Sequence, residues 1–125
     1  MITNVGLSLL RDALKGDISD CEIKYVAWGD GAAALAVTDT QLQNELGRHL
    51  VTSQVAGAAA GILDTIIYLA PADAVATITR VGFFAGASAT AAANSGVMVA
   101  EFAYSKTKTA LFSLQLNLKD TITEA

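Results

Sequence analysis

The sequence predicts a mainly β fold, an antiparallel β-sandwich or small barrel with an N-terminal helix and one short internal helix. Three observations support this class. The 125 residues fit one domain. About six β-forming runs, separated by turn residues, follow residue 23. The last run alternates apolar and polar side chains with the period of a sheet that has one exposed face. We expect one domain over 1–125, with a helix in 1–16 and a β-rich body in 23–125.

The first element is an amphipathic helix in residues 3–15, which Thr3 or Asn4 can cap and Gly16 can end. Leucines recur along it at spacings of three and four, which places them on one face. That face can pack on its own domain, which is the simpler interpretation, or on another subunit. The leucines are therefore candidate subunit contacts: Leu7, Leu10 and Leu14.

Residues 24–48 join a buried strand to the short internal helix. The strand ends at a Gly29-Asp30-Gly31 turn, where the tolerance of glycine for positive φ predicts a sharp change of direction. Trp28, the one tryptophan, precedes this turn and is interpreted as a plug at the end of the core. An exposed Trp28 that stacks on a sugar is the alternative.

A capping box of Thr38 and Gln41 predicts that the short helix covers about residues 39–47. Glu45 and Arg48 lie three residues apart at its end, a spacing that allows an ion pair. We interpret these two residues as a structural clamp. A general acid needs a second acid or a histidine close by, and none accompanies Glu45 in the sequence.

The remainder of the chain is expected to be β-rich. An alanine-rich segment, 86–96, is expected to be a flexible loop, either a mobile tip or an arm that orders on a partner. In the last strand Leu111 interrupts the polar face, which makes it a further candidate subunit contact. The expected strands are 49–56, 62–69, 77–84, 97–104 and, after a turn at 106–108, 110–119.

Composition and charge argue against several classes of function. The net charge of -4 and the scattered basic residues leave no basic face for nucleic acid. The longest weakly polar stretch, 55–72, is interrupted before it reaches the roughly 20 apolar residues of a membrane helix. No cationic start followed by an apolar run marks a signal peptide, which favours synthesis in a cytoplasm. The lone Cys21 is consistent with a reducing compartment and is interpreted as an unreactive thiol.

The sequence likewise offers no set of residues for catalysis. The single histidine, His49, has no converging metal ligands, and no serine lies in a nucleophile elbow. We therefore expect no catalytic, cofactor-binding or metal-binding residues. In contrast, 53% of residues are hydrophobic and only 16% are charged, against an average of about 25% charged. This excess of mostly small apolar residues predicts contacts between subunits, with trimers and rings of six among the arrangements.

Three blocks of residues carry a resemblance to a known family. They are Lys24–Gly31 (KYVAWGDG), Thr38–Arg48 (TDTQLQNELGR) and Ile78–Phe84 (ITRVGFF). In order and spacing they resemble small structural proteins of tailed bacteriophage virions, found in tail fibres, baseplates and their attachment pieces, whose pattern is KYIAIGTG, SDTxLxxEVxR and ITEIGLF. Arg80 departs from this pattern because it replaces the usual acidic residue, so its pairing must differ here.

The resemblance implies a non-enzymatic structural protein, located in the virion and assembled in the cytoplasm of the host bacterium. Its partners would be copies of itself and other virion proteins of the tail, baseplate or fibre attachment. A capsid decoration or vertex protein is an alternative of the same class. A module that binds a carbohydrate receptor on the host is an alternative of a different class.

Overall fold

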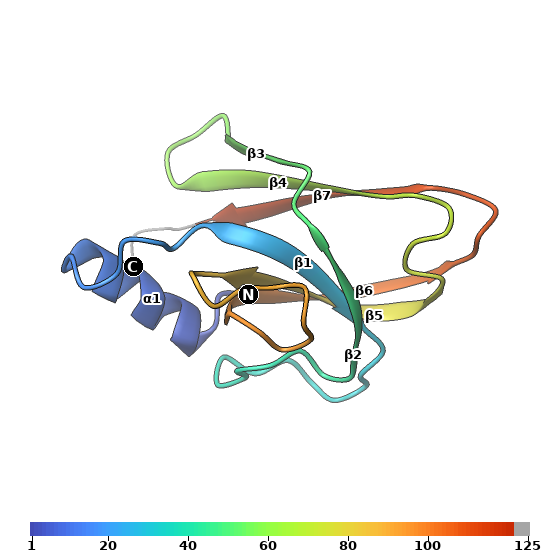
Figure 1. Cartoon of the computed structure of the whole chain (residues 1–125), viewed down its shortest axis with the longest axis horizontal. Helices are drawn as coiled ribbons and strands as arrows, with labels where there is room; N and C mark the ends of the chain where they lie inside the picture. The colour runs from blue at the N-terminus through green and yellow to red at the C-terminus, as the bar shows by residue number, and fades with distance from the viewer. Residues whose placement is uncertain (122–125) are drawn as a thin grey trace.

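The structure is a computed structural model that describes residues 1–121 (Figure 1). In this part of the chain the strands form two antiparallel sheets, of order β2-β1-β5-β6 and β3-β4-β7, which do not close into a barrel. The prediction of a mainly β fold with two antiparallel sheets is confirmed. The elements are α1 (Asn4–Leu14), β1 (Ile23–Gly29), β2 (Glu45–Leu50), β3 (Ser53–Ala56), β4 (Ile62–Leu69), β5 (Ala76–Ala85), β6 (Val97–Lys108) and β7 (Leu114–Thr121).

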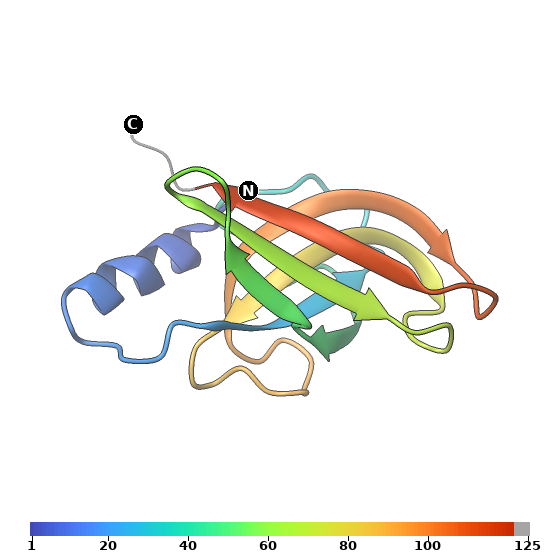
Figure 2. The same ribbon diagram turned by 90° about the horizontal axis from the view of Figure 1, so that it is seen from above.

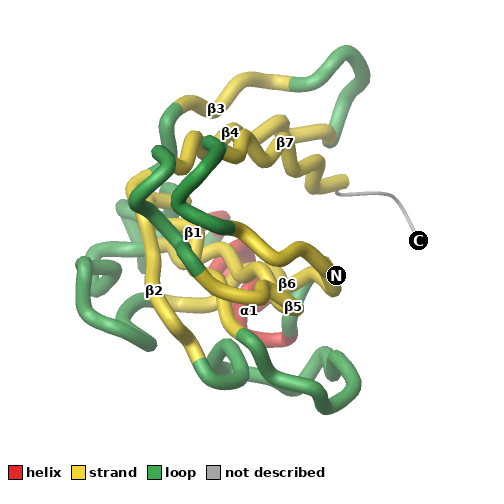
Figure 3. The backbone as a smooth tube through the Cα atoms, turned by 90° about the vertical axis from the view of Figure 1, so that its right-hand side faces the viewer, coloured by secondary structure: helices red, strands yellow, loops and turns green. Residues whose placement is uncertain are grey.

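The two sheets lie face to face, with the three-stranded sheet forming one layer and the four-stranded sheet the other (Figure 3). Large apolar side chains from both sheets fill the space between them. They include Val26 and Trp28 of β1, Val81 and Phe83 of β5, Ile67 and Leu69 of β4, and Leu116 of β7. Trp28 is only 8% exposed. Its predicted position in the core is confirmed, and the exposed Trp28 required for sugar stacking is contradicted.

The four-stranded sheet is also covered on its outer face. A second cluster, of Ala27, Leu42, Phe84 and Met98, lies there. Leu42 belongs to the loop of residues 30–44, so this loop contributes a side chain to the cluster. As a result β5 is buried on both faces from Arg80 to Ala85.

Between β2 and β3 the chain crosses from one sheet to the other. Val51 N donates to Lys24 O at 3.0 Å on the first sheet, and Thr52 N donates to Ile66 O at 2.9 Å on the second. Both backbone groups at the crossing are therefore satisfied, which a partly buried connection requires. The predicted single strand over 49–56 is in fact two strands in different sheets.

The N-terminal segment attaches α1 to β6. Thr3 is fully buried and caps the helix, because its Oγ1 accepts a hydrogen bond from Gly6 N at 3.0 Å. Its backbone N donates to Val99 O at 2.9 Å, and Ile2 forms a β-bridge with Ala100. The predicted cap is confirmed. So is the predicted end of the helix, because Gly16 has a φ of 83°, in the left-handed region that favours glycine.

The helix packs on β6 through a different face from the one that the sequence favoured. Gly6 and Leu9 are buried, and a Cβ on Gly6 would lie 2.3 Å from Val99 O. In contrast Leu7 is 52% exposed and Leu14 is 90% exposed. The simpler interpretation, that the leucine face packs inside its own domain, is therefore wrong for these two residues. The small Gly6 permits close backbone contact between α1 and β6, and α1 lies at one end of the molecule (Figure 2).

The predicted short helix over residues 39–47 is not formed. Residues 39–44 are turns and irregular backbone, and Glu45 already begins β2, where Gly47 pairs with Trp28 of β1. Asn44, just before β2, has a φ of 45°, which no helix accommodates. A helix of this length gains little stability from its own sequence, whereas the open edge of β1 offers a ladder of backbone hydrogen bonds.

The connection between β6 and β7, which belong to different sheets, begins later in the chain than predicted. The expected turn at 106–108 is instead part of β6, and the expected strand 110–119 begins only at Leu114. Lys108 explains the longer β6: its side chain is buried and Nζ donates to Ala70 O at 2.9 Å and to Pro71 O at 3.0 Å. The alternation predicted for the last strand is confirmed where β7 exists, since Leu116 is buried and its neighbours are exposed.

Candidate functional site

Glu45 and Arg48, the predicted clamp, form a bidentate ion pair at the start of β2. Arg48 Nε donates to Glu45 Oε1 at 2.6 Å, and Nη2 donates to Oε2 at 2.9 Å. The Arg48 and Glu45 side chains are only 2% and 1% exposed. The guanidinium also lies over the ring of Phe84, 4.3 Å from its centroid. A planar guanidinium with this many donors suits a buried pair better than an ammonium would.

The pair fixes the alanine-rich loop of residues 86–96, which we call the β5–β6 loop. Arg48 Nη1 donates to Ser95 O at 3.0 Å and to Thr90 O at 3.1 Å. Glu45 Oε2 accepts a hydrogen bond from Asn94 N at 2.9 Å. The loop is thus held from both residues of the pair. A loop that was expected to be flexible is tied to the edge strand β2 in the structure.

A second buried charge cluster lies under the loop of residues 30–44. It consists of Asp39 from this loop, Glu101 of β6 and Arg80 of β5. Glu101 is 2% exposed and Arg80 is 6% exposed. Arg80 is the residue that departs from the family pattern, and its positive charge favours the ionised form of both acids. Arg80 therefore lies close enough to Asp39 and Glu101 to act on both carboxyls through its charge, a proximity that no local sequence spacing reveals.

The two acids of this cluster have opposite pKa shifts. Burial, followed by the neighbouring Asp39 carboxyl, raises the pKa of Glu101 to about 7. A hydrogen bond from the Glu101 carboxyl lowers the pKa of Asp39, which also accepts a hydrogen bond from Ala36 N at 3.0 Å. Glu101 Oε1 has no hydrogen-bond partner among residues 1–121. Burial and the neighbouring carboxyl thus favour the neutral form of Glu101, whereas Asp39 is the acid of the two that favours the ionised form.

β1 ends at Gly29, and Asp30 and Gly31 continue as irregular backbone rather than as the predicted turn; the reason for the two glycines also differs from the expected one. Neither Gly29 nor Gly31 has a positive φ. Instead, a Cβ on Gly29 would lie 2.5 Å from Gln43 O, and a Cβ on Gly31 would lie 2.2 Å from Gln43 Cβ. The side chain of Asp30 accepts a hydrogen bond from Asn44 Nδ2. The glycines allow the two ends of the 30–44 loop to approach each other.

The four candidate subunit contacts lie at two ends of the molecule. Leu7 and Leu14 are exposed on α1, and Leu10 is partly buried beside them. Leu111 is 92% exposed in the turn between β6 and β7. Figure 1 shows this turn at one end of the long axis and α1 at the other. The structure contains one chain, so these contacts stay predictions.

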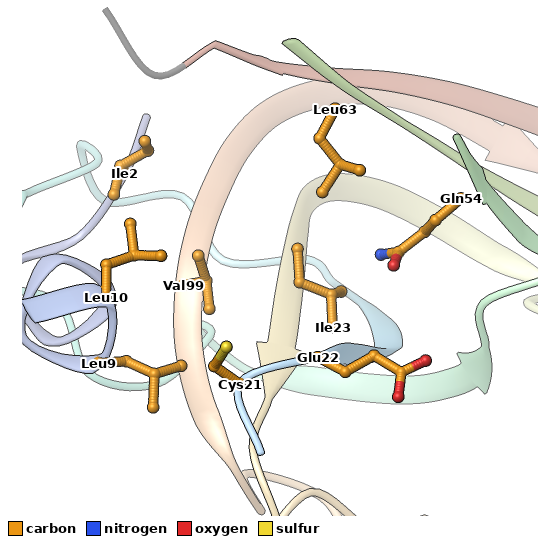
Figure 4. A pocket seen from close by; sticks show the side chains of 9 residues that line it. All are labelled: Ile2, Leu9, Leu10, Cys21, Glu22, Ile23, Gln54, Leu63 and Val99. Carbon is orange, nitrogen blue, oxygen red and sulfur yellow. The ribbon is translucent and has the colours of Figure 1, made fainter. Parts of the chain in front are cut away.

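An apolar cavity of about 180 Å³ lies next to α1, where the two sheets separate (Figure 4). Leu9 and Leu10 contribute from the helix, Val99 from β6 and Leu63 from β4. Cys21, Glu22 and Gln54 are the polar or thiol-bearing residues of its lining. Sequence reasoning missed this cavity, because its walls come from segments that are far apart in the chain and carry no shared motif.

Among residues 1–121 no three His, Cys, Asp or Glu residues converge as metal ligands. His49 is on β2, where its Nδ1 lies 2.7 Å from Leu50 O. Cys21 is a free, exposed thiol. No helix within this described part combines the length and the apolar character needed to cross a bilayer.

Comparison with known proteins adds no relative to this description. No family model, no curated protein and no solved structure matches the chain.

Proposed function

We propose that the chain is a non-enzymatic structural protein of a tailed bacteriophage virion, which assembles through symmetric contacts in the tail, baseplate or fibre attachment. The observation that carries this proposal is the exposure of large apolar side chains at both ends, 90% for Leu14 and 92% for Leu111. Isolated apolar residues are normal on a surface, but here Leu7 and Leu14 are exposed on the same helix whose Leu9 and Leu10 line the apolar cavity. The resemblance of the three sequence blocks to structural proteins of tailed bacteriophages supports a location in the virion.

The buried charges support a role as a rigid connector. The β5–β6 loop is held by the Glu45–Arg48 pair. The 30–44 loop is held by hydrogen bonds from Asn4 N to Val37 O and from Thr79 Oγ1 to Gly31 O, both at 2.7 Å. Loops that are fixed in the free protein lose little conformational entropy when a partner binds. Such a module suits repeated contacts of constant geometry.

Two alternatives remain proposals with less support. A capsid decoration or vertex protein would use the same exposed side chains and differs only in its position in the particle. A carbohydrate-binding module needs an accessible aromatic side chain, and the one tryptophan is in the core. Tyr68 on β4, which is 46% exposed, is the aromatic side chain that such a module could use to stack on a sugar.

The experiment that tests the proposal combines solution mass with particle composition. We would measure the mass of the purified chain by light scattering over a range of concentrations, and search for its peptides in particles purified from the strain that encodes it. We expect the mass to rise above that of one chain and the peptides to be present in the particles. A chain that stays monomeric at all concentrations and is absent from particles would overturn the proposal. An image reconstruction would then distinguish tail from capsid.

A further inference from the structure

One large apolar side chain, that of Leu111, projects from the turn between β6 and β7, and we call it the knob. Leu111 is 92% exposed, and its backbone N donates to Thr109 Oγ1 at 3.3 Å. The turn is anchored behind the knob by Lys108, whose Nζ binds the carbonyls of Ala70 and Pro71. Phe112, next to the knob, packs near Lys106, with Nζ 5.5 Å from the ring centroid. The leucine therefore projects from a turn that is held in place.

The opposite end of the molecule carries a cavity large enough for a leucine side chain. The cavity of about 180 Å³ is lined mainly by apolar residues, namely Ile2, Leu9, Leu10, Ile23, Leu63 and Val99. An apolar cavity of about 150 Å³ is large enough to bind benzene, so this one has room for a leucine side chain. Figure 4 shows these side chains converging from α1, β1, β4 and β6. Leu7 and Leu14 add exposed apolar surface on the same helix.

The charges beside the two surfaces are complementary. Lys106 is exposed next to the knob, and Glu22 is exposed in the lining of the cavity. Two other acids near the helix already have partners, since Asp17 lies 3.0 Å from the ammonium of Lys15 and Asp20 lies 2.6 Å from that of Lys24. Glu22 is thus the carboxylate of the cavity lining that could meet a cation from a second copy.

We propose that Leu111 of one copy inserts into the apolar cavity beside α1 of the next copy, with Lys106 approaching Glu22. This inference rests on the proposed function, because it specifies the contact by which copies assemble. The knob and the cavity are different surfaces at opposite ends of the folded molecule (Figure 2). The contact between two copies is therefore head-to-tail. A head-to-tail contact closes into a ring when its rotation permits and otherwise extends as a filament.

The test uses the natural Cys21, the only cysteine, which lines the cavity. In an Ala110→Cys variant, which keeps Leu111 and places an exposed thiol beside it, an added oxidant is expected to join the introduced thiol of one copy to Cys21 of the next. Insertion of Leu111 is expected to bring the two Cα atoms within the roughly 7 Å that a disulfide tolerates. Each linked species keeps one free thiol at either end, so we expect a ladder of dimers, trimers and larger species. Peptide mass spectrometry identifies which two thiols are joined.

Several control variants accompany the Ala110→Cys variant. Gln41→Cys places an exposed thiol on the 30–44 loop, away from the knob, and should give no ladder. For the charges, Lys106→Glu and Glu22→Lys should each weaken association of the otherwise unchanged protein, and the double variant should restore it. Leu111→Ser should abolish the contact. Leu111 is almost fully exposed, so its replacement is not expected to affect folding.

Specific outcomes overturn the inference. Oligomers in which the introduced thiols are joined only to one another would contradict the head-to-tail contact but leave the proposed assembly function intact. A chain that forms no oligomers under any condition would contradict both.

Discussion

Replacement of Arg48 by methionine is expected to cost the protein a large share of its stability. The variant keeps the length of the side chain but removes the charge, and it leaves the Glu45 carboxylate buried with Asn94 N as its remaining donor. Removing one partner of a buried ion pair costs about 3–5 kcal/mol. At an unfolding entropy of about 2.1 cal/mol/K per residue, this corresponds to a decrease in Tm of roughly 11–19 °C for this chain.

Thermal and urea unfolding, followed by the fluorescence of the buried Trp28, measures this loss. Arg11→Met is the matched control, because Arg11 forms an ion pair with Asp12 but its side chain is 64% exposed. We expect little change in that control, since exposed pairs contribute little. The double variant Glu45→Leu with Arg48→Met should be more stable than Arg48→Met alone, because it no longer buries an unpaired charge.

Hydrogen exchange gives an independent measure of the same clamp. The amide of Asn94, which donates to Glu45, should exchange faster in Arg48→Met as the β5–β6 loop loosens. If Arg48→Met lowered Tm by less than about 4 °C, equivalent to roughly 1 kcal/mol, the pair would behave like a surface pair and the reasoning would be refuted.

Three further predictions follow from other sites. The raised pKa of Glu101 favours its protonated form in the folded state, so its contribution lowers stability as pH rises from the unfolded value near 4.5 to about 7. We expect Glu101→Gln, which can still donate to Asp39, to remove this decrease and to be the more stable protein at about pH 8, above both pKa values; unfolding curves that decline equally in both proteins would contradict this. Gly6→Ala should destabilise the fold by about 1–3 kcal/mol, because its Cβ would meet the Val99 carbonyl at 2.3 Å; a loss under about 0.5 kcal/mol in urea unfolding would show that α1 can shift freely. Emission of Trp28 should be blue-shifted and resist quenching by acrylamide, and strong quenching in the folded protein would contradict its burial.

The sequence predicted the fold class well because its strongest patterns are local. The β-branched run 62–69 and the alternation after residue 114 correspond to β4 and β7. The helix cap at Thr3 could also be predicted from the sequence, because a cap depends on neighbours within a few residues. Predictions that rested on local patterns alone were wrong where pairing with a distant strand was an alternative to the predicted structure. The capping box at Thr38 favoured a helix, but pairing of residues 45–50 with β1 prevailed.

The candidate site was predictable only in part. The spacing of Glu45 and Arg48 indicated an ion pair, and the pair survives although the expected helix is absent. The same pattern could not reveal that Arg48 holds the β5–β6 loop, because the two residues of that contact, Arg48 and Ser95, are 47 positions apart in the sequence. The cluster around Glu101 and the cavity beside α1 are equally non-local, since each depends on which segments the two sheets bring together.

The strand order has a consequence for how the protein is made. β1 needs β5, residues 76–85, as its central neighbour, and β4 needs β7, residues 114–121. On the ribosome, β1 therefore lacks its central neighbour until residue 85 has been synthesised, and β4 lacks β7 until residue 121 has been synthesised. Sheets that depend on such late, long-range strand pairing fold slowly and pass through aggregation-prone intermediates. Fragments that end before β7 should accumulate in inclusion bodies, whereas the intact chain can complete both sheets.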